Sequence, residues 1–187
     1  MVVSNFQKKL PMYITLSRIA ITPPIAICIW LDNTWGLWAA AVLFILGAIT
    51  DYFDGYYARK YHAETNLGRL MDPVADKILV TVTLLMLLPL RKVDPYMVGL
   101  LLSRDLVIGA IRAAAAADHL VIDAKAFGKW KTAIQLGCVP ALLIDGPILG
   151  IPIHHIGYIG LWISVSLSLI SAWEYIQLYR RAGRGAH

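Results

Sequence analysis

The chain has 187 residues, of which 58% are apolar and 16% are charged, and its mean hydropathy is +0.63. Soluble domains carry about a quarter charged residues, so this composition excludes an ordinary water-soluble domain and predicts a single membrane domain over residues 1–187. The net charge of +5 does not indicate nucleic-acid binding, because the basic residues gather at the ends of apolar segments, as in membrane proteins.

Apolar segments recur along the whole chain and predict an all-α polytopic membrane protein with six transmembrane helices. A membrane-spanning helix needs about 20 residues, and charges that enter one end shorten several of these segments. Before them, Ser4–Leu10 is a candidate for a short interfacial helix, and Pro23 and Pro24 predict a kink in the first span. The six segments are Met12–Leu31, Trp35–Tyr57, Leu70–Leu90, Tyr96–Ala117, Lys131–Asp145 and Ile153–Tyr179.

The distribution of basic residues orients the predicted spans. An even number of spans places both termini on one side, and the excess of Lys and Arg marks that side as cytoplasmic. The connections around Asp32 and Asp145 carry almost no basic residues and are predicted outside, although Arg91 and Lys92 break the pattern. The cytoplasmic basic residues are Lys8, Lys9, Arg18, Arg59, Lys60, Arg69, Lys125, Lys129, Lys131, Arg180, Arg181 and Arg184.

Four carboxylates flank the second connection. Asp51 and Asp54 are spaced i, i+3, and Asp72 and Asp76 are spaced i, i+4, so each pair shares one helix face. Pro73 suits the first turn of the third helix. An acidic residue at membrane depth costs about 2.5–3.5 kcal/mol, so four together need cations. Oxygen ligands favour Mg²⁺, Mn²⁺ or Ca²⁺, and four carboxylates can hold two ions. The alternative, a solvated cluster of helix-end charges, explains two carboxylates better than four.

Small residues and one arginine complete this region. Gly55, Ala58 and Gly68 permit close approach of a ligand, or equally of a neighbouring helix. Arg59 is a candidate phosphate contact, with an interfacial anchor as the alternative. The pattern D-x2-D-G-x2-A-R-x8-G-x3-D-x3-D, from Asp51 to Asp76, resembles the signature of the CDP-alcohol phosphotransferases. Eight fixed positions within 26 residues make this resemblance specific.

The resemblance implies a homodimeric six-helix enzyme of the bacterial inner membrane, with its active site facing the cytoplasm. By analogy with the family, two divalent cations, Mg²⁺ or Mn²⁺, bind the four motif carboxylates, and Asp76 is also the candidate general base. The residues expected to bind the CDP moiety are Asp54, Gly55, Ala58, Arg59 and Gly68, with Arg59 near the diphosphate.

Basic residues in the fourth and fifth segments bear on the acceptor alcohol. Arg104 and Arg112 are spaced i, i+8 on one helix face, and with Lys129 they predict a pocket for an acceptor that carries its own phosphate. Two alternatives stay open: Arg104 belongs to a buried ion-pair network with Asp105, or Lys129 and Lys131 are cytoplasmic anchors.

Further motifs resemble the bacterial phosphatidylglycerophosphate synthase branch of the family. These are an Arg-Asp pair with an arginine eight residues later, the run G-K-x-K-T from Gly128, and T-L-S-R from Thr15 to Arg18. The branch's N-x-P-N-x-L-T opening is absent, and LPMYITLSR stands in its place. The predicted partners are CDP-diacylglycerol, sn-glycerol 3-phosphate and membrane lipids. Alternatives are phosphatidylinositol-phosphate synthase, cardiolipin synthase of the same fold and, in another class, a divalent-cation transporter.

Overall fold

The computed structural model describes residues 5–60, 66–117 and 126–184, and the side chains of residues 17–50, 77–115 and 130–180. Within these ranges the protein consists of six helices, which confirms the all-helical prediction, and short connections join α1 to α2, α3 to α4 and α5 to α6. The helices are α1 Asn5–Trp30, α2 Thr34–Lys60, α3 Asn66–Leu87, α4 Pro95–Ala117, α5 Ala126–Leu143 and α6 Ile153–Arg184.

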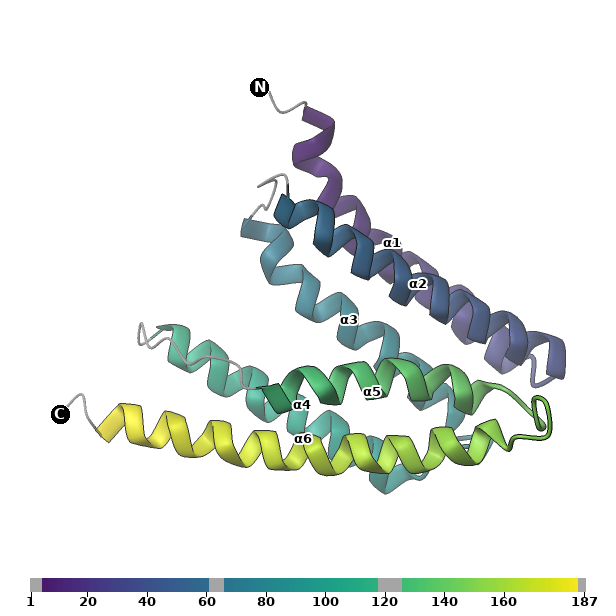
Figure 1. Ribbon diagram of the computed structural model, residues 1–187. Helices are drawn as coiled ribbons and strands as arrows, with labels where there is room; N and C mark the ends of the chain where they lie inside the picture. Colours follow the sequence, from purple (N-terminus) through teal and green to yellow (C-terminus); the bar gives the residue numbers. More distant parts are fainter. Residues whose placement is uncertain (1–4, 61–65, 118–125, 185–187) are drawn as a thin grey trace.

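Successive helices run in opposite directions along the molecule (Figure 1). The connections 31–33, 88–94 and 144–152 lie together at one end, which we call the loop end. At the other end, the motif end, α2 finishes at Lys60 and α3 begins at Asn66. The longest turn at the loop end closes through mutual backbone hydrogen bonds between Ile148 and Ile151, of 3.1 and 2.9 Å.

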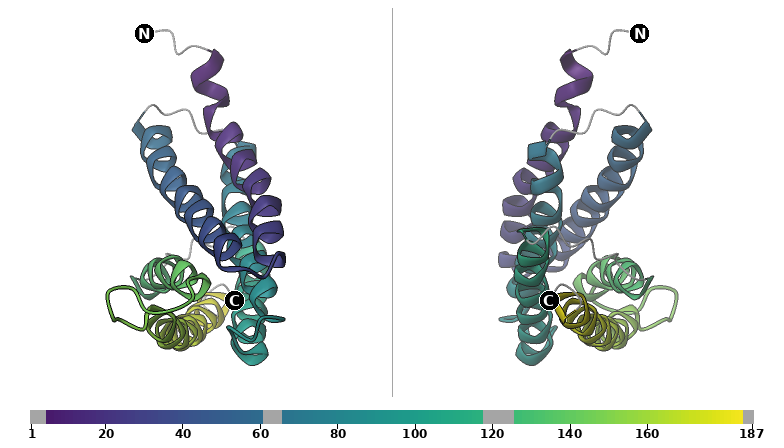
Figure 2. Two further views of the ribbon diagram at one scale, coloured as in Figure 1. Left: turned by 90° about the vertical axis from the view of Figure 1, so that its right-hand side faces the viewer. Right: turned by 90° about the vertical axis from the view of Figure 1, so that its left-hand side faces the viewer.

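The helices pack in two groups. α1 lies against α2 and α3, whereas α5 lies along α6, and α4 packs mainly on α6 (Figure 2). Contacts of α5 with α2 and α3 join the groups. The largest fully buried side chains come from all six helices, which therefore share one core: Ile25, Ile29, Leu37, Phe44, Leu79, Leu84, Leu87, Met97, Val98, Leu142, Leu143 and Leu161.

Large apolar side chains also cover much of the outer surface. They follow α2, α4 and α6 and include Trp35, Val42, Ile45, Leu46, Ile49, Leu106, Val107, Ile156, Ile159, Ile163, Ile170 and Trp173. Patches this extensive mark contact with lipid or another protein. Among the described residues, Ile153–Arg180 is long and apolar enough to cross a membrane. Shorter apolar stretches lie at Ser17–Trp30, Thr34–Thr50 and Lys77–Leu87. The chain therefore has at least one candidate membrane helix, and the six-span arrangement stays a prediction.

Besides α5, which begins at Ala126 rather than at Lys131, two predictions about helix boundaries are wrong. α1 is continuous from Asn5 to Trp30, so Ser4–Leu10 does not form a separate helix. α3 begins at Asn66 rather than at Leu70, so Pro73 lies two turns inside the helix instead of in its first turn. In both places the chain continues an existing helix across polar residues, because helix propagation is easier than nucleation.

Three basic residues counted as cytoplasmic, or as exceptions to the topology, are buried. Arg18 and Lys131 are each 4% exposed, so neither is a surface anchor. Lys92 lies at the loop end, where a basic residue contradicts the predicted topology, but its ammonium forms an ion pair with Asp145. Because the neighbouring connection supplies the counter-charge, Lys92 adds no net positive charge to that end.

Candidate functional site

The motif carboxylates lie on two helices, α2 and α3, toward the same end of the molecule. Asp51 and Asp54 lie in the last three turns of α2, and Asp72 and Asp76 lie in the first three turns of α3. Their side chains fall outside the described residues, as do those of the CDP-site candidates Gly55, Ala58, Arg59 and Gly68. Their convergence on bound cations therefore stays a prediction.

The residue types of the motif determine which metal ions could bind there. Among the side chains that the structure describes, no three His, Cys, Asp or Glu residues form a group suited to a metal ion. The four motif carboxylates offer only oxygen ligands, which fit hard divalent cations and not zinc. The motif end of α2 and α3 is thus a part of the chain whose residue types suit such ions.

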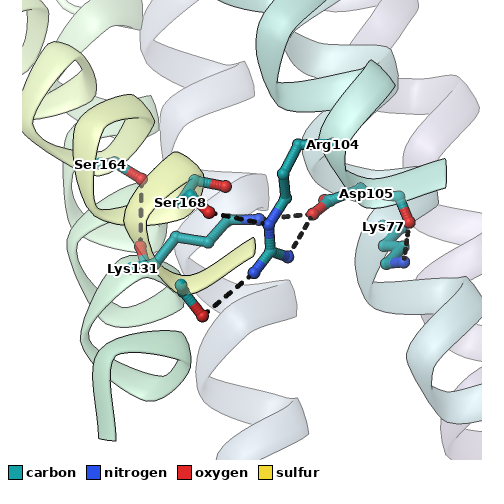
Figure 3. Close-up of polar contacts among 7 residues, drawn as sticks. Lys77, Arg104, Asp105, Lys131, Ser164 and Ser168 are labelled. Carbon is teal, nitrogen blue, oxygen red and sulfur yellow. Dashed lines mark hydrogen bonds and ion pairs between the residues drawn. The ribbon is translucent and has the colours of Figure 1, made fainter. Parts of the chain in front are cut away.

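A polar cluster lies between α4, α5 and α6, beside α3 (Figure 3). At its centre, the Arg104 guanidinium donates three hydrogen bonds: from Nη1 to Asp105 Oδ1 at 2.9 Å, from Nε to the Ser168 carbonyl at 3.0 Å and from Nη2 to Ser171 Oγ at 3.3 Å. The first bond stays on α4, whereas the other two reach α6. Arg104 therefore joins two helices through a single planar group.

A second cation binds the same carboxylate. Lys131 on α5 donates from Nζ to Asp105 Oδ1 at 2.6 Å, and its backbone carbonyl accepts a bond from Ser164 Oγ at 3.2 Å. On the α3 side, Lys77 Nζ donates to the backbone carbonyl of Asp105 at 3.3 Å. We call these residues, Lys77, Arg104, Asp105 and Lys131 with Ser164, Ser168 and Ser171, the Asp105 cluster.

Among the described side chains, the charges of the Asp105 cluster do not balance. The side chains of Arg104 and Lys131 are 12% and 5% exposed, and that of Asp105 is 20% exposed. The buried Lys131 and the partly buried Arg104 therefore share one carboxylate, and the more exposed Lys77 adds a third positive charge. An uncompensated charge is unfavourable in an apolar interior unless a ligand or another ion neutralises it. The cluster is electrostatically suited to an anion.

The predicted basic pocket is only partly assembled by the described residues. Arg112, two turns beyond Arg104 on α4, is exposed, and its guanidinium carbon lies 5.5 Å from the centre of the Tyr175 ring. The side chain of Lys129 lies outside the described residues. Both arginines contact α6, but the cation beside Arg104 is Lys131. The alternative prediction, an ion-pair network of Arg104 with Asp105, is confirmed by the contact between them.

Sequence reasoning missed the role of α6 in this cluster. Ser164, Ser168 and Ser171 are spaced i, i+4, i+7, which is one face of a helix, and this spacing was a usable signal. The Ser168 hydroxyl is buried and has no hydrogen-bond partner among the described residues. No comparable signal pairs Lys131 with Asp105, because the two residues lie 26 positions apart on different helices.

The loop end carries a different set of polar contacts. Lys92 pairs with Asp145, and the Tyr158 hydroxyl donates to a carboxylate oxygen of Asp94. The rings of His154 and His155 meet edge to face, with centroids 5.9 Å apart. In these contacts, Lys92 and Asp94 each have a separate partner. Such contacts are expected to stabilise the packing of neighbouring connections rather than to bind a ligand.

Comparison with known proteins shows the family. Residues 8–170 match the CDP-alcohol phosphatidyltransferase family, and the chain belongs to it. Members of this family are typically embedded in membranes and generally depend on divalent cations. The resemblance inferred from Asp51 to Asp76 is thereby confirmed.

Several relatives are similar over nearly their whole length. The chain is 33% identical to a CDP-diacylglycerol–glycerol-3-phosphate 3-phosphatidyltransferase of Rickettsia felis, with 95% of this chain and 98% of the relative covered. It is 34% identical to the protein of that name from Rickettsia prowazekii, covering 92% and 96%. It is 35% identical to the one from Bacillus subtilis, covering 89% and 92%.

Proposed function

We propose that the protein transfers the phosphatidyl group of CDP-diacylglycerol to sn-glycerol 3-phosphate, forming phosphatidylglycerophosphate and CMP in phospholipid biosynthesis. The observation that carries this proposal is the similarity to relatives bearing that activity in their names, which extends over 89–95% of the chain at 33–35% identity. The unbalanced positive charge of Arg104, Lys131 and Asp105 supports an acceptor that is itself a phosphate.

The donor site that we propose is the motif of α2 and α3. Asp51, Asp54, Asp72 and Asp76 would hold two divalent cations, Mg²⁺ or Mn²⁺, which when bound neutralise negative charge on the diphosphate. The residues proposed for the CDP moiety are Asp54, Gly55, Ala58, Arg59 and Gly68. Arg59 is suited to the diphosphate, because a guanidinium forms paired hydrogen bonds with phosphate oxygens.

The reaction is a displacement at phosphorus. Arg104, Arg112 and Lys129 hold the phosphate of the acceptor, and the Asp76 carboxylate takes the proton of its 1-hydroxyl. The freed oxygen bonds to the lipid-side phosphorus of CDP-diacylglycerol, the bond from that phosphorus to the bridging oxygen breaks, and CMP leaves with the electron pair. Most of the rate enhancement in phosphoryl transfer comes from positioning and electrostatics, which is the role of these side chains.

We further propose that the chain forms one domain whose six helices span the bacterial inner membrane, with the motif end at the cytoplasmic face. The apolar side chains exposed along α2, α4 and α6 support contact with lipid, and the basic residues near the motif end support its orientation. As in the family resemblance, we expect a homodimer.

The deciding experiment supplies purified protein with CDP-diacylglycerol and either Mg²⁺ or Mn²⁺. Separate reactions contain glycerol 3-phosphate, inositol phosphate or serine, and CMP formation is measured. We expect CMP only with glycerol 3-phosphate, and none after chelation of the metal. CMP formation with inositol phosphate instead would identify the alternative enzyme, phosphatidylinositol-phosphate synthase, which the positive cluster also suits.

A further inference from the structure

One oxygen of Asp105 binds two cations from different helices, the partly buried Arg104 and the buried Lys131. Asp105 Oδ1 accepts the bonds from Arg104 on α4 and from Lys131 on α5 (Figure 3). Because both cationic groups bond to the same atom, the carboxylate determines how far apart they lie. Arg104 is also bonded to Ser168 and Ser171, so its orientation is defined from two sides.

These cations retain capacity to bind a ligand. A guanidinium has five N–H groups, and the bonds of Arg104 within the described residues use three of them. An ammonium has three, and Lys131 directs one of them at Asp105. The remaining donors, together with the excess positive charge, are what a phosphate dianion requires. Asp105 removes only part of that charge.

The backbone of the same residue is linked to the motif helix. The carbonyl of Asp105 accepts a bond from Lys77, which follows the candidate base Asp76 directly on α3. The Lys77 ammonium also lies over Gly109, 3.9 Å from where a side chain would begin. Asp105 thus contacts α3 beside the motif through its backbone carbonyl. Its carboxylate contacts the two cations, Arg104 and Lys131.

We propose that Asp105 is a positioning residue of the acceptor site. It holds Arg104 and Lys131 in the arrangement that binds the acceptor phosphate. The cluster lies beside Lys77 of α3, the residue that follows the end of the motif. This inference rests on the proposed function, because it takes glycerol 3-phosphate as the acceptor. It differs from a purely structural ion pair in that loss of the carboxylate disturbs one substrate and not the other.

The test is Asp105→Asn in the full-length protein in detergent. Asparagine keeps the size and one oxygen but removes the charge that holds both cations. We expect the KM for glycerol 3-phosphate to rise about tenfold or more, as for loss of a charge-assisted hydrogen bond, and the KM for CDP-diacylglycerol to change less than about twofold. Asp105→Glu, which retains the charge, should recover part of the loss.

A double variant separates positioning from stability. In Asp105→Asn the buried Lys131 loses its counter-charge, which lowers thermal stability. Adding Lys131→Met removes that buried charge, so stability should return. Because Lys131 itself belongs to the proposed phosphate site, the double variant is compared with Lys131→Met alone, and its KM for glycerol 3-phosphate should be the higher of the two, since Arg104 has also lost Asp105. If the double variant and Lys131→Met have the same KM for glycerol 3-phosphate, or if both KM values stay at the wild-type level in Asp105→Asn, the carboxylate is structural and the inference is wrong.

The outcomes also distinguish this inference from the proposed function. A wild-type protein that releases no CMP with glycerol 3-phosphate refutes the proposed function, and the inference fails with it. A normal wild-type protein combined with equal loss for both substrates in Asp105→Asn refutes the inference alone. Asp145→Asn, which breaks the ion pair of Lys92 at the loop end, is the matched control and should leave both KM values unchanged.

Discussion

The loop end and the Asp105 cluster use partly buried charge in different ways. At the loop end, Lys92 has its own carboxylate in Asp145, and Asp94 has the hydroxyl of Tyr158. In the Asp105 cluster, nearer the motif end, Arg104 and Lys131 share one carboxylate. Both sets tie helices together, but only the Asp105 cluster leaves positive charge without a counter-ion among the described residues.

This difference separates structural from functional polar groups. A balanced ion pair such as Lys92 with Asp145 needs nothing from outside the chain, and its loss is expected to change stability alone. An unbalanced buried cluster is tolerated where a ligand supplies the missing charge, which is why perturbed charges gather at functional sites. Variants in the motif and in the proposed acceptor site should therefore change turnover or substrate affinity, whereas variants at the loop end should change stability.

The largest expected effect is at the motif end. Asp76→Asn removes both a proposed metal ligand and the proposed base, so CMP release should fall by roughly 10³-fold, and Asp72→Asn should have a similar effect. Size-exclusion chromatography in detergent should show that each variant remains folded. Turnover like that of the wild type in either variant would remove the catalytic assignment.

Asp32→Asn is the matched control for these variants. Asp32 is exposed in the connection 31–33 at the loop end and has a φ of 44°, a conformation that asparagine also adopts readily. The same change of side chain should therefore leave CMP release within about twofold of the wild type. A loss as large as in Asp76→Asn would contradict the separation between the two ends.

Arg112→Ala should have the next largest effect. Removing a phosphate-binding cation is expected to raise the KM for glycerol 3-phosphate by about 10- to 100-fold, with a smaller effect on CDP-diacylglycerol. The guanidinium also stacks on Tyr175, so packing is lost too. Arg112→Lys keeps the charge without the planar stack and should retain more acceptor affinity. Equal loss for both substrates would argue against an acceptor-site role.

Gly157→Ala should reduce stability without changing substrate affinity. A side chain at Gly157 would lie 2.9 Å from the Ala141 Cβ and 3.1 Å from the Cys138 carbonyl, so α5 and α6 would have to separate. Overpacking of this kind costs about 2 kcal/mol, which thermal unfolding in detergent would register. Gly137→Ala is the control, because nothing lies within 4 Å of its added carbon. Equal destabilisation by both variants would contradict the close packing of α5 and α6.

The smallest effect is expected from Asp145→Asn. The Lys92 side chain is 10% exposed and that of Asp145 is 49% exposed, so solvent screens part of the attraction between them. Loss of the pair should cost about 1 kcal/mol and lower the melting temperature by a few degrees. The KM values should not change, and a specific rise in the KM for glycerol 3-phosphate would show that the loop end also serves the acceptor.

Much of the helical architecture was predictable because its signals are local. The start of α6 at Ile153 and the end of α4 at Ala117 agree with the apolar segments drawn from the sequence. The errors lie where polar residues extend a helix, before Met12, before Leu70 and before Lys131, since hydropathy does not register such turns. The spacing from Asp51 to Asp76 was sufficient for the family, because it combines eight positions within two adjacent helices.

The sequence by itself determined the six helices, the motif on α2 and α3, and membership of the family. Only the tertiary structure decided the partners of the charges: Lys131 with Asp105, Arg104 with the α6 serines, and Lys92 with Asp145. Helix position along the chain follows from local propensity and hydropathy. Which side chains meet across helices depends on how each helix is rotated about its own axis, and that rotation is set by packing among residues far apart in the sequence.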